Sequence, residues 1–385
     1  MKIAILGYGT VGSGALEAAG HADDIEVKYI LVRHDPERIP SMTEDYGLIL
    51  ADEEIEVVAE CIGGIHPAYE YVKAALEHGK HVVTPNKNLI SAYYEDLTSL
   101  AGKNGVSIRF TSSAGGGIPW LFNLRRAKRC DDITEIFGIV NGTCNYILDS
   151  MHRDGSSFDD ILGKAQELGY AEADPSSDIE GTDTMRKCVI SSDIAFDTAL
   201  DEEDIPVLGI DTITAEDISF FNARGWTCKL MMNAGLSDGK LCAYVEPTVF
   251  DSSALESNVS ANNNMITLIG SNIGRLSFFG QGAGMMPTGT SVIQDVIDIR
   301  DSINFESGAD EDRIEVDNST AVHRYYIRIG RDVNGFPFDL IEDQTESHKA
   351  LFLITKPISV SEAHMLAKEY ADTDKPLFMA GIKES

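Results

Sequence analysis

Residues 2–14 read KIAILGYGTVGSG, and this stretch decides the fold of the first part of the chain. The apolar run KIAIL predicts a buried strand, and TVGSGALEAAG after it predicts a helix. The glycines between them have the spacing G-x-G-x-x-G, which lets backbone N–H groups approach a pyrophosphate at the helix N-terminus. We therefore expect a dinucleotide here; glycines that only permit a tight turn are the alternative. The residues expected to contact the dinucleotide are Gly7, Gly9, Thr10, Val11 and Gly12.

Strands and helices continue to alternate after this loop. EVKYILV, VVAECIG and HVVTPN read as strands, and PAYEYVKAALEHG reads as a helix that stops at Gly79. This order predicts an α/β fold with an N-terminal, Rossmann-type, doubly wound parallel sheet. We assign residues 1–130 to this dinucleotide-binding domain. A helix over 286–302 is expected to pack back onto it and complete it.

The pattern changes near residue 131. ITEIFGIVNG reads as a strand, residues 182–196 as a helix, and WTCKLMMNAGLSDGKLCAYVEP as a hairpin with a Ser-Asp-Gly turn. ITLIGSNIGRLSFFG reads as a second hairpin. We expect residues 131–285 to form an α+β domain for substrate binding and oligomerisation. Residues 320–385 contain three strand-like runs and one helix, enough for a short α+β module.

Composition and charge exclude several classes of protein. The 385 residues carry a formal net charge of −31, so a nucleic-acid backbone or an anionic membrane would be repelled. A solvated acidic surface and a salt-adapted source both explain this charge. No apolar run approaches the ~20 residues of a membrane span, and the first residues lack signal-peptide features. The six cysteines are scattered without zinc spacing, so we expect reduced thiols and a cytoplasmic protein.

The end of the second strand bears on the choice between NAD and NADP. NAD sites usually place an acidic residue there for the ribose 2′-hydroxyl, whereas a basic residue accommodates a 2′-phosphate. This strand ends Val32-Arg33-His34, and Asp35 comes only afterwards. The sequence therefore favours NADP, read by Arg33, with NAD use left open. A solvated surface arginine is the alternative.

Two further strand ends supply candidate site residues. ECIGG and TPNK each follow a buried strand, at the sheet edge where open α/β sheets bind ligands. We expect Ile62, Gly63 and Gly64 to line the nicotinamide side of the cofactor. Lys87 is expected to act in the site, although an exposed charge is the alternative.

The densest group of chemically active residues lies in GYAEADPSSDIEGTDTMRK, residues 169–187. A helix over 182–196 places Asp183 and Lys187 one turn apart, where they can pair. A lysine held by a carboxylate and shielded from water can accept the proton that leaves an alcohol during hydride transfer. Carboxylates in the same stretch could hold a substrate ammonium. An acidic surface loop before a helix is the alternative.

Seven segments together resemble the homoserine dehydrogenase family, in that family's order. They are GYGTVGSG, ECIGG, TPNK, SAGGGIP, GIVNGTCNYIL, AQELGYAEADPSSDIEGTDTMRK and GQGAGMMPTGTSVIQDV. The resemblance covers roughly residues 1–302, and its most specific part runs from Ala165 to Lys187. It implies an NAD(P)-dependent interconversion of L-homoserine and L-aspartate 4-semialdehyde, in threonine, methionine and isoleucine biosynthesis.

The resemblance also implies roles for matching residues. Lys187 would be the acid/base at the C4 oxygen, oriented by Asp183, and Lys87 would lie between nicotinamide and substrate. Gly282 to Gly284 would close over the cofactor. The remaining substrate contacts would come from Glu172 and Asp178 at the ammonium, and from Tyr170, Gly142 and Thr143. Relatives suggest a homodimer or homotetramer.

The chain departs from the family pattern in two places. Family members bind a monovalent cation through backbone carbonyls in a segment that usually begins with glutamate, and Thr111 stands there in this chain. A Na⁺ or K⁺ site formed by the carbonyls of Thr111, Ala114, Gly116 and Ile118 is therefore a weaker expectation. The C-terminal segment resembles a shortened ACT module without the usual glycine-rich ligand turn, which leaves regulation by threonine in doubt.

The residues present disfavour three rival functions. Aspartate-semialdehyde dehydrogenase needs an activated thiol, and none of the six cysteines has a recognisable setting for one. A redox-sensing protein that binds dinucleotide without turnover would not need the set Glu172, Asp183 and Lys187. A regulatory subunit would be expected to lack the lysine and its partner. The sequence leaves the kinetic direction, the cofactor preference, the effector and the subunit count open.

Overall fold

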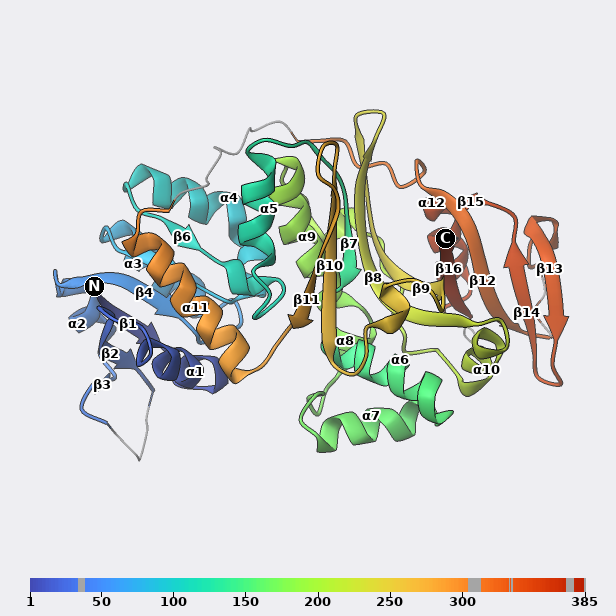
Figure 1. Ribbon diagram of the computed structural model, residues 1–385, viewed down its shortest axis with the longest axis horizontal. Coiled ribbons are helices and arrows are strands. Elements are labelled where there is room, and N and C mark those ends of the chain that lie inside the picture. Colours follow the sequence, from blue (N-terminus) through green and yellow to red (C-terminus); the bar gives the residue numbers. More distant parts are fainter. Residues whose placement is uncertain (34–38, 304–312, 332, 334, 372–376, 384–385) are drawn as a thin grey trace. The chain divides into compact units, whose positions relative to one another are not determined.

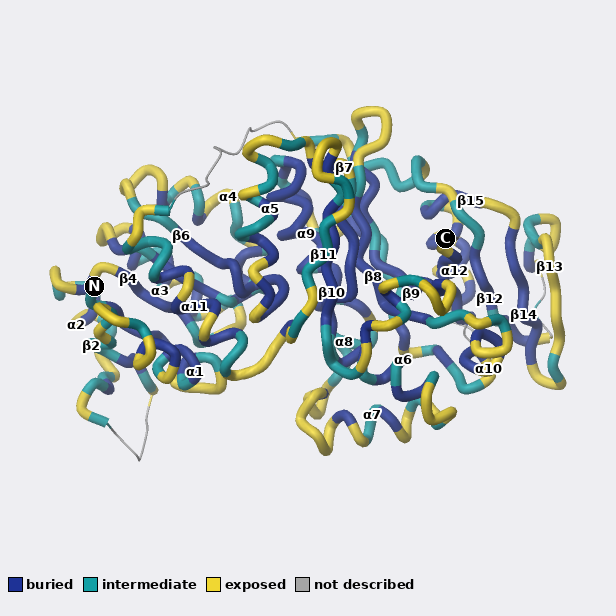
Figure 2. The backbone as a smooth tube through the Cα atoms, viewed as in Figure 1, coloured by how far each residue is buried: buried dark blue, intermediate teal, exposed yellow. Residues whose placement is uncertain are grey.

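The computed structural model describes residues 1–33, 39–303, 313–331, 333, 335–371 and 377–383. Its chain divides into two compact units, each with its own sheet (Figure 1). Unit 1 contains Met1–Asp131, Asp193–Asp201 and Gly280–Glu311. Unit 2 contains Asp132–Ser192, Glu202–Phe279 and Asp312–Ser385. In both units the central strands are buried (Figure 2).

Unit 1 is built on a six-stranded sheet in which all pairs are parallel. The order is β3-β2-β1-β4-β5-β6, so the chain runs outward from β1 in one direction and then from β4 in the other. This confirms the doubly wound sheet, whose ligand-binding edge lies beyond the carboxyl ends of the strands where the order reverses. The strands are β1 (Lys2–Leu6), β2 (Glu26–Leu31), β3 (Met42–Thr43), β4 (Ile55–Glu60), β5 (His81–Val83) and β6 (Ile108–Arg109).

The helices of unit 1 cover the sheet, and the last of them comes from far along the chain. They are α1 (Thr10–Ala19), α2 (Tyr46–Ala51), α3 (Ala68–Glu77), α4 (Lys87–Lys103), α5 (Trp120–Lys128) and α11 (Met285–Arg300), with the 3₁₀ turn η1 (Thr111–Ser113). The backbones of α1 and α11 touch, because a Cβ on Gly14 would lie 2.2 Å from the carbonyl oxygen of Met285. Val292 and Val296 of α11 are fully buried in the same core as Ile3 and Ile5 of β1.

Unit 2 is built on a mixed sheet with the order β11-β10-β7-β8-β9-β16-β12-β14-β13. The predicted hairpin at Asp238–Gly239 is confirmed: both residues have positive φ, 51° and 78°, as a two-residue turn between twisted strands requires. The strands are β7 (Ile133–Ile139), β8 (Trp226–Ser237), β9 (Lys240–Asp251), β10 (Asn263–Gly270), β11 (Gly274–Gln281), β12 (Val322–Gly330), β13 (Ile341–Glu346), β14 (Ala350–Thr355), β15 (Ile358–Ser359) and β16 (Phe378–Lys383).

The C-terminal strands belong to the same sheet as the middle of the chain. β16 pairs in parallel with β9 and antiparallel with β12, so it joins the two groups of strands. Figure 1 shows this continuity from β8 and β9 through β16 to β12. The resemblance of residues 320–385 to an ACT module stays a prediction.

The helices of unit 2 include three that the sequence did not predict, one of which begins at the end of a predicted strand. ITEIFGIVNG was expected to be a strand throughout, but β7 ends at Ile139. The side chain of Asn141 accepts a hydrogen bond from Cys144 N and starts a helix at Gly142. The helices are α6 (Gly142–Asp154), α7 (Phe158–Glu167), α8 (Ser176–Ile179), α9 (Thr182–Phe196), α10 (Ala215–Ala223) and α12 (Val360–Glu369), with 3₁₀ turns η2 (Glu202–Asp204), η3 (Glu256–Asn258) and η4 (Phe338–Leu340). The last residues of α9, 193–196, belong to unit 1. Over the described ranges, no helix is both long and apolar enough to cross a bilayer.

Candidate active site

The glycines of the turn between β1 and α1 differ in what a side chain at each position would meet. Gly7 has φ +95°, and a Cβ there would lie 2.9 Å from the carbonyl oxygen of Cys61. A Cβ on Gly12 would lie 2.1 Å from the carbonyl oxygen of Gly7. A Cβ on Gly9 would meet no atom within 4 Å, so space is open beside the N-terminus of α1, which has no acidic side chain in its first turn. This cradle fits the phosphates of a dinucleotide.

The residues after β2 give partial information about the 2′ position of the adenosine ribose. Arg33 is exposed two residues beyond the end of β2. His34 and Asp35 lie outside the described residues. The exposed arginine can therefore reach a ligand, and the choice between NADP and NAD stays a prediction.

The turn after β4 is organised by a buried carboxylate. Glu60, the last residue of β4, is fully buried. Its Oε1 accepts hydrogen bonds from Ile62 N at 2.7 Å and Gly63 N at 3.1 Å. Its Oε2 accepts from Thr84 Oγ1 at 2.6 Å, in the turn after β5. One side chain thus joins the two turns that the sequence predicts on the nicotinamide side.

The turn after β5 extends this network to the start of α4. The hydroxyl of Thr84 accepts from Asn86 N at 3.0 Å, and Asn86 Nδ2 donates to the carbonyl oxygen of Gly64 at 2.6 Å. Asn86 also caps α4 by accepting from Leu89 N. Lys87, the first residue of α4, is half-buried. Ile62 to Gly64 and Lys87 are therefore held by a single set of contacts.

The two remaining glycine-rich segments of unit 1 lie against each other. A Cβ on Gly116 would lie 2.3 Å from the carbonyl oxygen of Gly282, so the two backbones are in contact. Gly284 precedes α11 with φ +127°. The N–H of Thr111 donates to Asp295 Oδ2 of α11 at 2.9 Å, and burial raises the pKa of the Asp295 carboxyl to about 6. The segment proposed for a cation therefore lies beside a buried acid.

Polar atoms around this segment are incompletely satisfied. Ser112 Oγ is buried and has no hydrogen-bond partner among the described residues. The carbonyl oxygen of Ile118 accepts from Trp120 N at 2.7 Å. Across the described part of the chain, no three His, Cys, Asp or Glu side chains are arranged to hold a metal ion.

Unit 2 contains the predicted pair of lysine and aspartate. Lys187 and Asp183 are 8% and 2% exposed, and Lys187 Nζ lies 2.7 Å from Asp183 Oδ2. The ammonium also donates to the carbonyl oxygen of Val140 at 2.7 Å. Asn141 donates from Nδ2 to Asp183 Oδ2 at 2.8 Å and to Asp178 Oδ1 at 2.7 Å. Asp178, Asp183 and Lys187 therefore belong to one polar cluster organised by Asn141.

The other predicted substrate residues lie around this cluster. Thr143 Oγ1 donates to the carbonyl oxygen of Tyr170 at 2.5 Å, so the start of α6 is tied to the acidic turn. The ring of Tyr170, which is 40% exposed, lies edge-on to Tyr146 with centroids 5.0 Å apart. Glu172 is exposed, and Gly142 begins α6.

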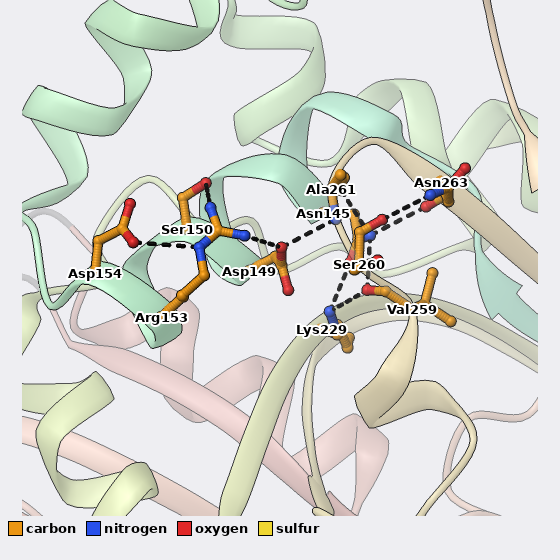
Figure 3. A network of polar contacts seen from close by, with 10 residues as sticks. All are labelled: Asn145, Asp149, Ser150, Arg153, Asp154, Lys229, Val259, Ser260, Ala261 and Asn263. Atoms are coloured by element: carbon orange, nitrogen blue, oxygen red, sulfur yellow. Dashed lines mark hydrogen bonds and ion pairs between the residues drawn. The ribbon is translucent and has the colours of Figure 1, made fainter.

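A buried network of hydrogen bonds holds α6 to β8 and to residues 259–263 (Figure 3). Asn145 Nδ2 donates to the carbonyl oxygens of Val259, Ala261 and Asn263 at 2.9–3.0 Å. Lys229 Nζ of β8 donates to Asn145 Oδ1 at 2.9 Å and to the carbonyl oxygen of Val259 at 2.7 Å. Burial lowers the pKa of Lys229 to about 8. These contacts fix the orientation of the helix whose first turn carries Gly142 and Thr143.

None of the cysteines with a resolved pKa shift has the setting of an activated nucleophile. Burial raises the pKa of the Cys61, Cys144 and Cys228 thiols above the usual range, and that of Cys242 to about 11. A thiol in this environment is protonated at neutral pH and unreactive. Chemistry through a thioester finds no support among these residues.

The predicted site residues form two groups, one in each unit. Unit 1 holds Gly7, Gly9, Thr10, Val11, Gly12, Arg33, Ile62, Gly63, Gly64, Lys87, Thr111, Ala114, Gly116, Ile118, Gly282 and Gly284. Unit 2 holds Gly142, Thr143, Tyr170, Glu172, Asp178, Asp183 and Lys187. Sequence reasoning missed two organising residues, Glu60 and Asp295, and it placed Asn141 in the site only as part of the segment Asn141-Gly142-Thr143. For Asn141, its position before the Gly142-Thr143 helix start was an available signal.

Comparison with known proteins identifies the family. The family description "Homoserine dehydrogenase, NAD binding domain" matches residues 7–111, and "Homoserine dehydrogenase" matches residues 119–297. A homoserine dehydrogenase of Bacillus subtilis is 39% identical over 313 residues, covering 77% of this chain and 72% of the relative. One from Synechocystis is 34% identical over 346 residues, covering 86% and 79%.

A solved structure agrees over the whole chain. The homoserine dehydrogenase from Thiobacillus denitrificans has a TM-score of 0.90 with 28% identity, covering 100% of this chain and 98% of that one. The order of motifs, the dinucleotide cradle and the lysine–carboxylate cluster agree with these likenesses. The chain belongs to the homoserine dehydrogenase family, whose members are nicotinamide-dependent oxidoreductases of amino-acid biosynthesis.

Proposed function

We propose that Lys187 exchanges the proton at the C4 oxygen when the enzyme interconverts L-homoserine and L-aspartate 4-semialdehyde. The observation that carries this is the buried pair, with Lys187 Nζ 2.7 Å from both Asp183 Oδ2 and the carbonyl oxygen of Val140. Two of the three N–H directions of the ammonium thus have acceptors among the described residues. The third is available to the substrate oxygen.

The chemistry divides between the cofactor and the protein. A nicotinamide held beside Ile62 to Gly64 would supply the hydride transfer at C4 in either direction. During oxidation the neutral amine of Lys187 takes the hydroxyl proton as the C4–H bond breaks, and during reduction its ammonium gives a proton to the aldehyde oxygen. Asp183 orients the lysine and compensates its charge. Lys87, at the start of α4, steers the reacting oxygen.

Substrate recognition in this proposal rests on two carboxylates. Asp178 and Glu172 bind the substrate ammonium, and the start of α6 with Thr143 and Tyr170 shapes the rest. The contact of Asn141 with Asp178 supports this role, because it orients the carboxylate beside the catalytic pair. A fixed acceptor lowers the cost of removing a charged ammonium from water.

The finer assignments of cofactor, ion and assembly complete the proposal. NADP is the preferred dinucleotide, with Arg33 at the 2′-phosphate. A Na⁺ or K⁺ ion binds the carbonyls of residues 111–118, supported by the unsatisfied Ser112 hydroxyl and the buried Asp295 carboxylate nearby. The protein acts in the cytoplasm as a homodimer or homotetramer. Phe279, 60% exposed on edge strand β11, supports association through the sheet of unit 2.

Comparison of Lys187→Ala with Lys164→Ala tests the central assignment. Lys164 is an exposed lysine on α7 in the same unit and serves as the matched control. We expect Lys187→Ala to lose roughly 10²–10⁴-fold in kcat for homoserine oxidation while NADPH binding stays near wild type. The control should keep full activity. A Lys187→Ala enzyme with more than about a tenth of wild-type turnover would contradict the assignment.

A further inference from the structure

Glu60 is a buried carboxylate that forms no ion pair with any described residue. It is fully buried at the end of β4, and both of its oxygens accept hydrogen bonds. The donors are two backbone N–H groups and the hydroxyl of Thr84, all of them neutral. A carboxylate buried without a counter-charge is costly to desolvate. A hydrophobic residue would be cheaper at this position unless the charge has a use.

The contacts of Glu60 form a closed ring of hydrogen bonds. One arm runs from Oε1 to Ile62 N and Gly63 N, and the other from Oε2 through Thr84 to Asn86. Asn86 Nδ2 completes the network by donating to the carbonyl oxygen of Gly64 at 2.6 Å. The turns after β4 and β5, and the start of α4, therefore depend on one side chain for their relative placement.

The glycines of this ring leave one side open. Gly63 and Gly64 have φ +80° and +70°, and a Cβ on either would meet no atom within 4 Å. Because both glycines follow β4 at the carboxyl edge of the sheet, this open side is suited to a flat ligand group. The negative charge of Glu60 lies directly beneath the same turn, through its bonds to Ile62 N and Gly63 N.

We propose that Glu60 is a positioning residue that holds residues 62–64 and Lys87 in register and that its charge favours the oxidised dinucleotide over the reduced one. This inference rests on the proposed placement of the nicotinamide at Ile62 to Gly64. The oxidised ring carries a positive charge and the reduced ring is neutral, so a nearby buried anion stabilises only the former. Low effective dielectric inside the protein makes such an interaction much stronger than it is in water.

The experiment compares Glu60→Gln with Glu56→Gln. Both residues lie on β4 and both changes remove one negative charge, but Glu56 is exposed. Dissociation constants for NADP⁺ and NADPH are measured by calorimetry on the full chain, beside thermal unfolding and homoserine kinetics. For Glu60→Gln we expect NADP⁺ affinity to fall on the order of tenfold relative to NADPH affinity, and kcat to fall while the KM for homoserine changes little. Glu56→Gln should behave as wild type in all of these.

An unchanged ratio of the two dissociation constants in a folded Glu60→Gln protein would overturn the proposal. Thr84→Val is the second variant, because it is isosteric and keeps the charge while cutting the link between the two turns. Thr84→Val should lower kcat and leave the ratio of dissociation constants as in wild type. Full activity of Thr84→Val would contradict the positioning role, even if Glu60→Gln failed to fold. The binding ratio needs no turnover. If the wild-type chain did not oxidise homoserine, the proposed function would be contradicted. The ratio of the NADP⁺ and NADPH dissociation constants would still test the role of Glu60.

Discussion

The ammonium of Lys187 lies 2.7 Å from Oδ2 of Asp183, four residues earlier on α9, with both side chains almost fully buried. The i, i+4 spacing brings the two groups to one face of the helix, and burial removes the water that would screen their charges. On a solvated helix the same pair would contribute little. In this buried site the charges of Lys187 and Asp183 stabilise each other.

Asp183→Asn tests that dependence. The amide keeps the shape of the carboxylate but leaves the Lys187 ammonium without its counter-charge, which is costly in a buried site. We expect homoserine turnover to fall about 10²-fold and the melting temperature to drop, with NADPH binding retained. Asp174→Asn, an exposed carboxylate in the same acidic stretch, is the control and should change neither quantity. Wild-type turnover in Asp183→Asn would show that the pair has only a structural role.

Glu172→Ala tests recognition of the substrate ammonium. The measurement is kcat/KM for homoserine and for 4-hydroxybutyrate, which lacks the amine. A charged hydrogen bond lost from the site should shrink the preference for homoserine roughly ten- to hundredfold, mainly through KM. Asp174→Ala is the matched control on an exposed neighbour. If the ratio stays the same in Glu172→Ala, the exposed carboxylate does not bind the ammonium.

Arg33→Glu tests the choice of dinucleotide. A carboxylate at this position repels a 2′-phosphate and can accept a hydrogen bond from a 2′-hydroxyl. NADP affinity should therefore fall at least about tenfold while NAD affinity falls less or rises. Arg126→Glu, on the exposed side of α5 in the same unit, gives the same change in net charge and should affect neither dinucleotide. Equal losses for NADP and NAD would exclude Arg33 as the residue that reads the 2′ position.

Lys229→Met tests the buried network behind α6 through the pH dependence of unfolding. Burial lowers the pKa of Lys229 to about 8 from its ordinary value of 10.5. Between these values the unfolded chain binds a proton that the folded chain has released, so the free energy of unfolding rises with pH. Below pH 8 both states carry the proton and the buried charge destabilises the fold.

We subtract the free energy of unfolding of Lys229→Met from that of wild type. This difference should increase by about 3 kcal/mol from pH 8 to pH 10.5. Denaturant unfolding at several pH values measures this difference, in which titrations common to both proteins cancel. The matched control is Lys240→Met. Lys240 is a partly exposed lysine on β9 whose pKa is raised by its hydrogen bonds to Glu315 and Asp317, so its difference curve should not rise in this window. A flat curve for Lys229→Met would mean that this lysine stays protonated in the folded state.

Local sequence was sufficient for the parts of the molecule whose geometry is set within a few residues. The strand-glycine-helix order of residues 2–14 is one such part, because only glycine tolerates φ +95° at Gly7 and the close approach at Gly12. The hairpin at Asp238–Gly239 is another, since its turn chemistry is local. Asp183 and Lys187 could be paired in advance because helical spacing alone brings them together.

Contacts between distant segments had to be found in the tertiary structure. Nothing local marks Glu60 as the link to Thr84, 24 residues later, or Asp295 as the partner of Thr111. Sheet order, which is the sum of packing over the whole unit, brings these residues together. Sequence favoured a site role for Asn141 but could not identify its two carboxylate partners, which lie about 40 residues away. Hydrophobic periodicity and turn residues thus determined the helices, the strands and the pairing of Asp183 with Lys187. Packing between distant segments decided which buried polar groups form hydrogen bonds with one another.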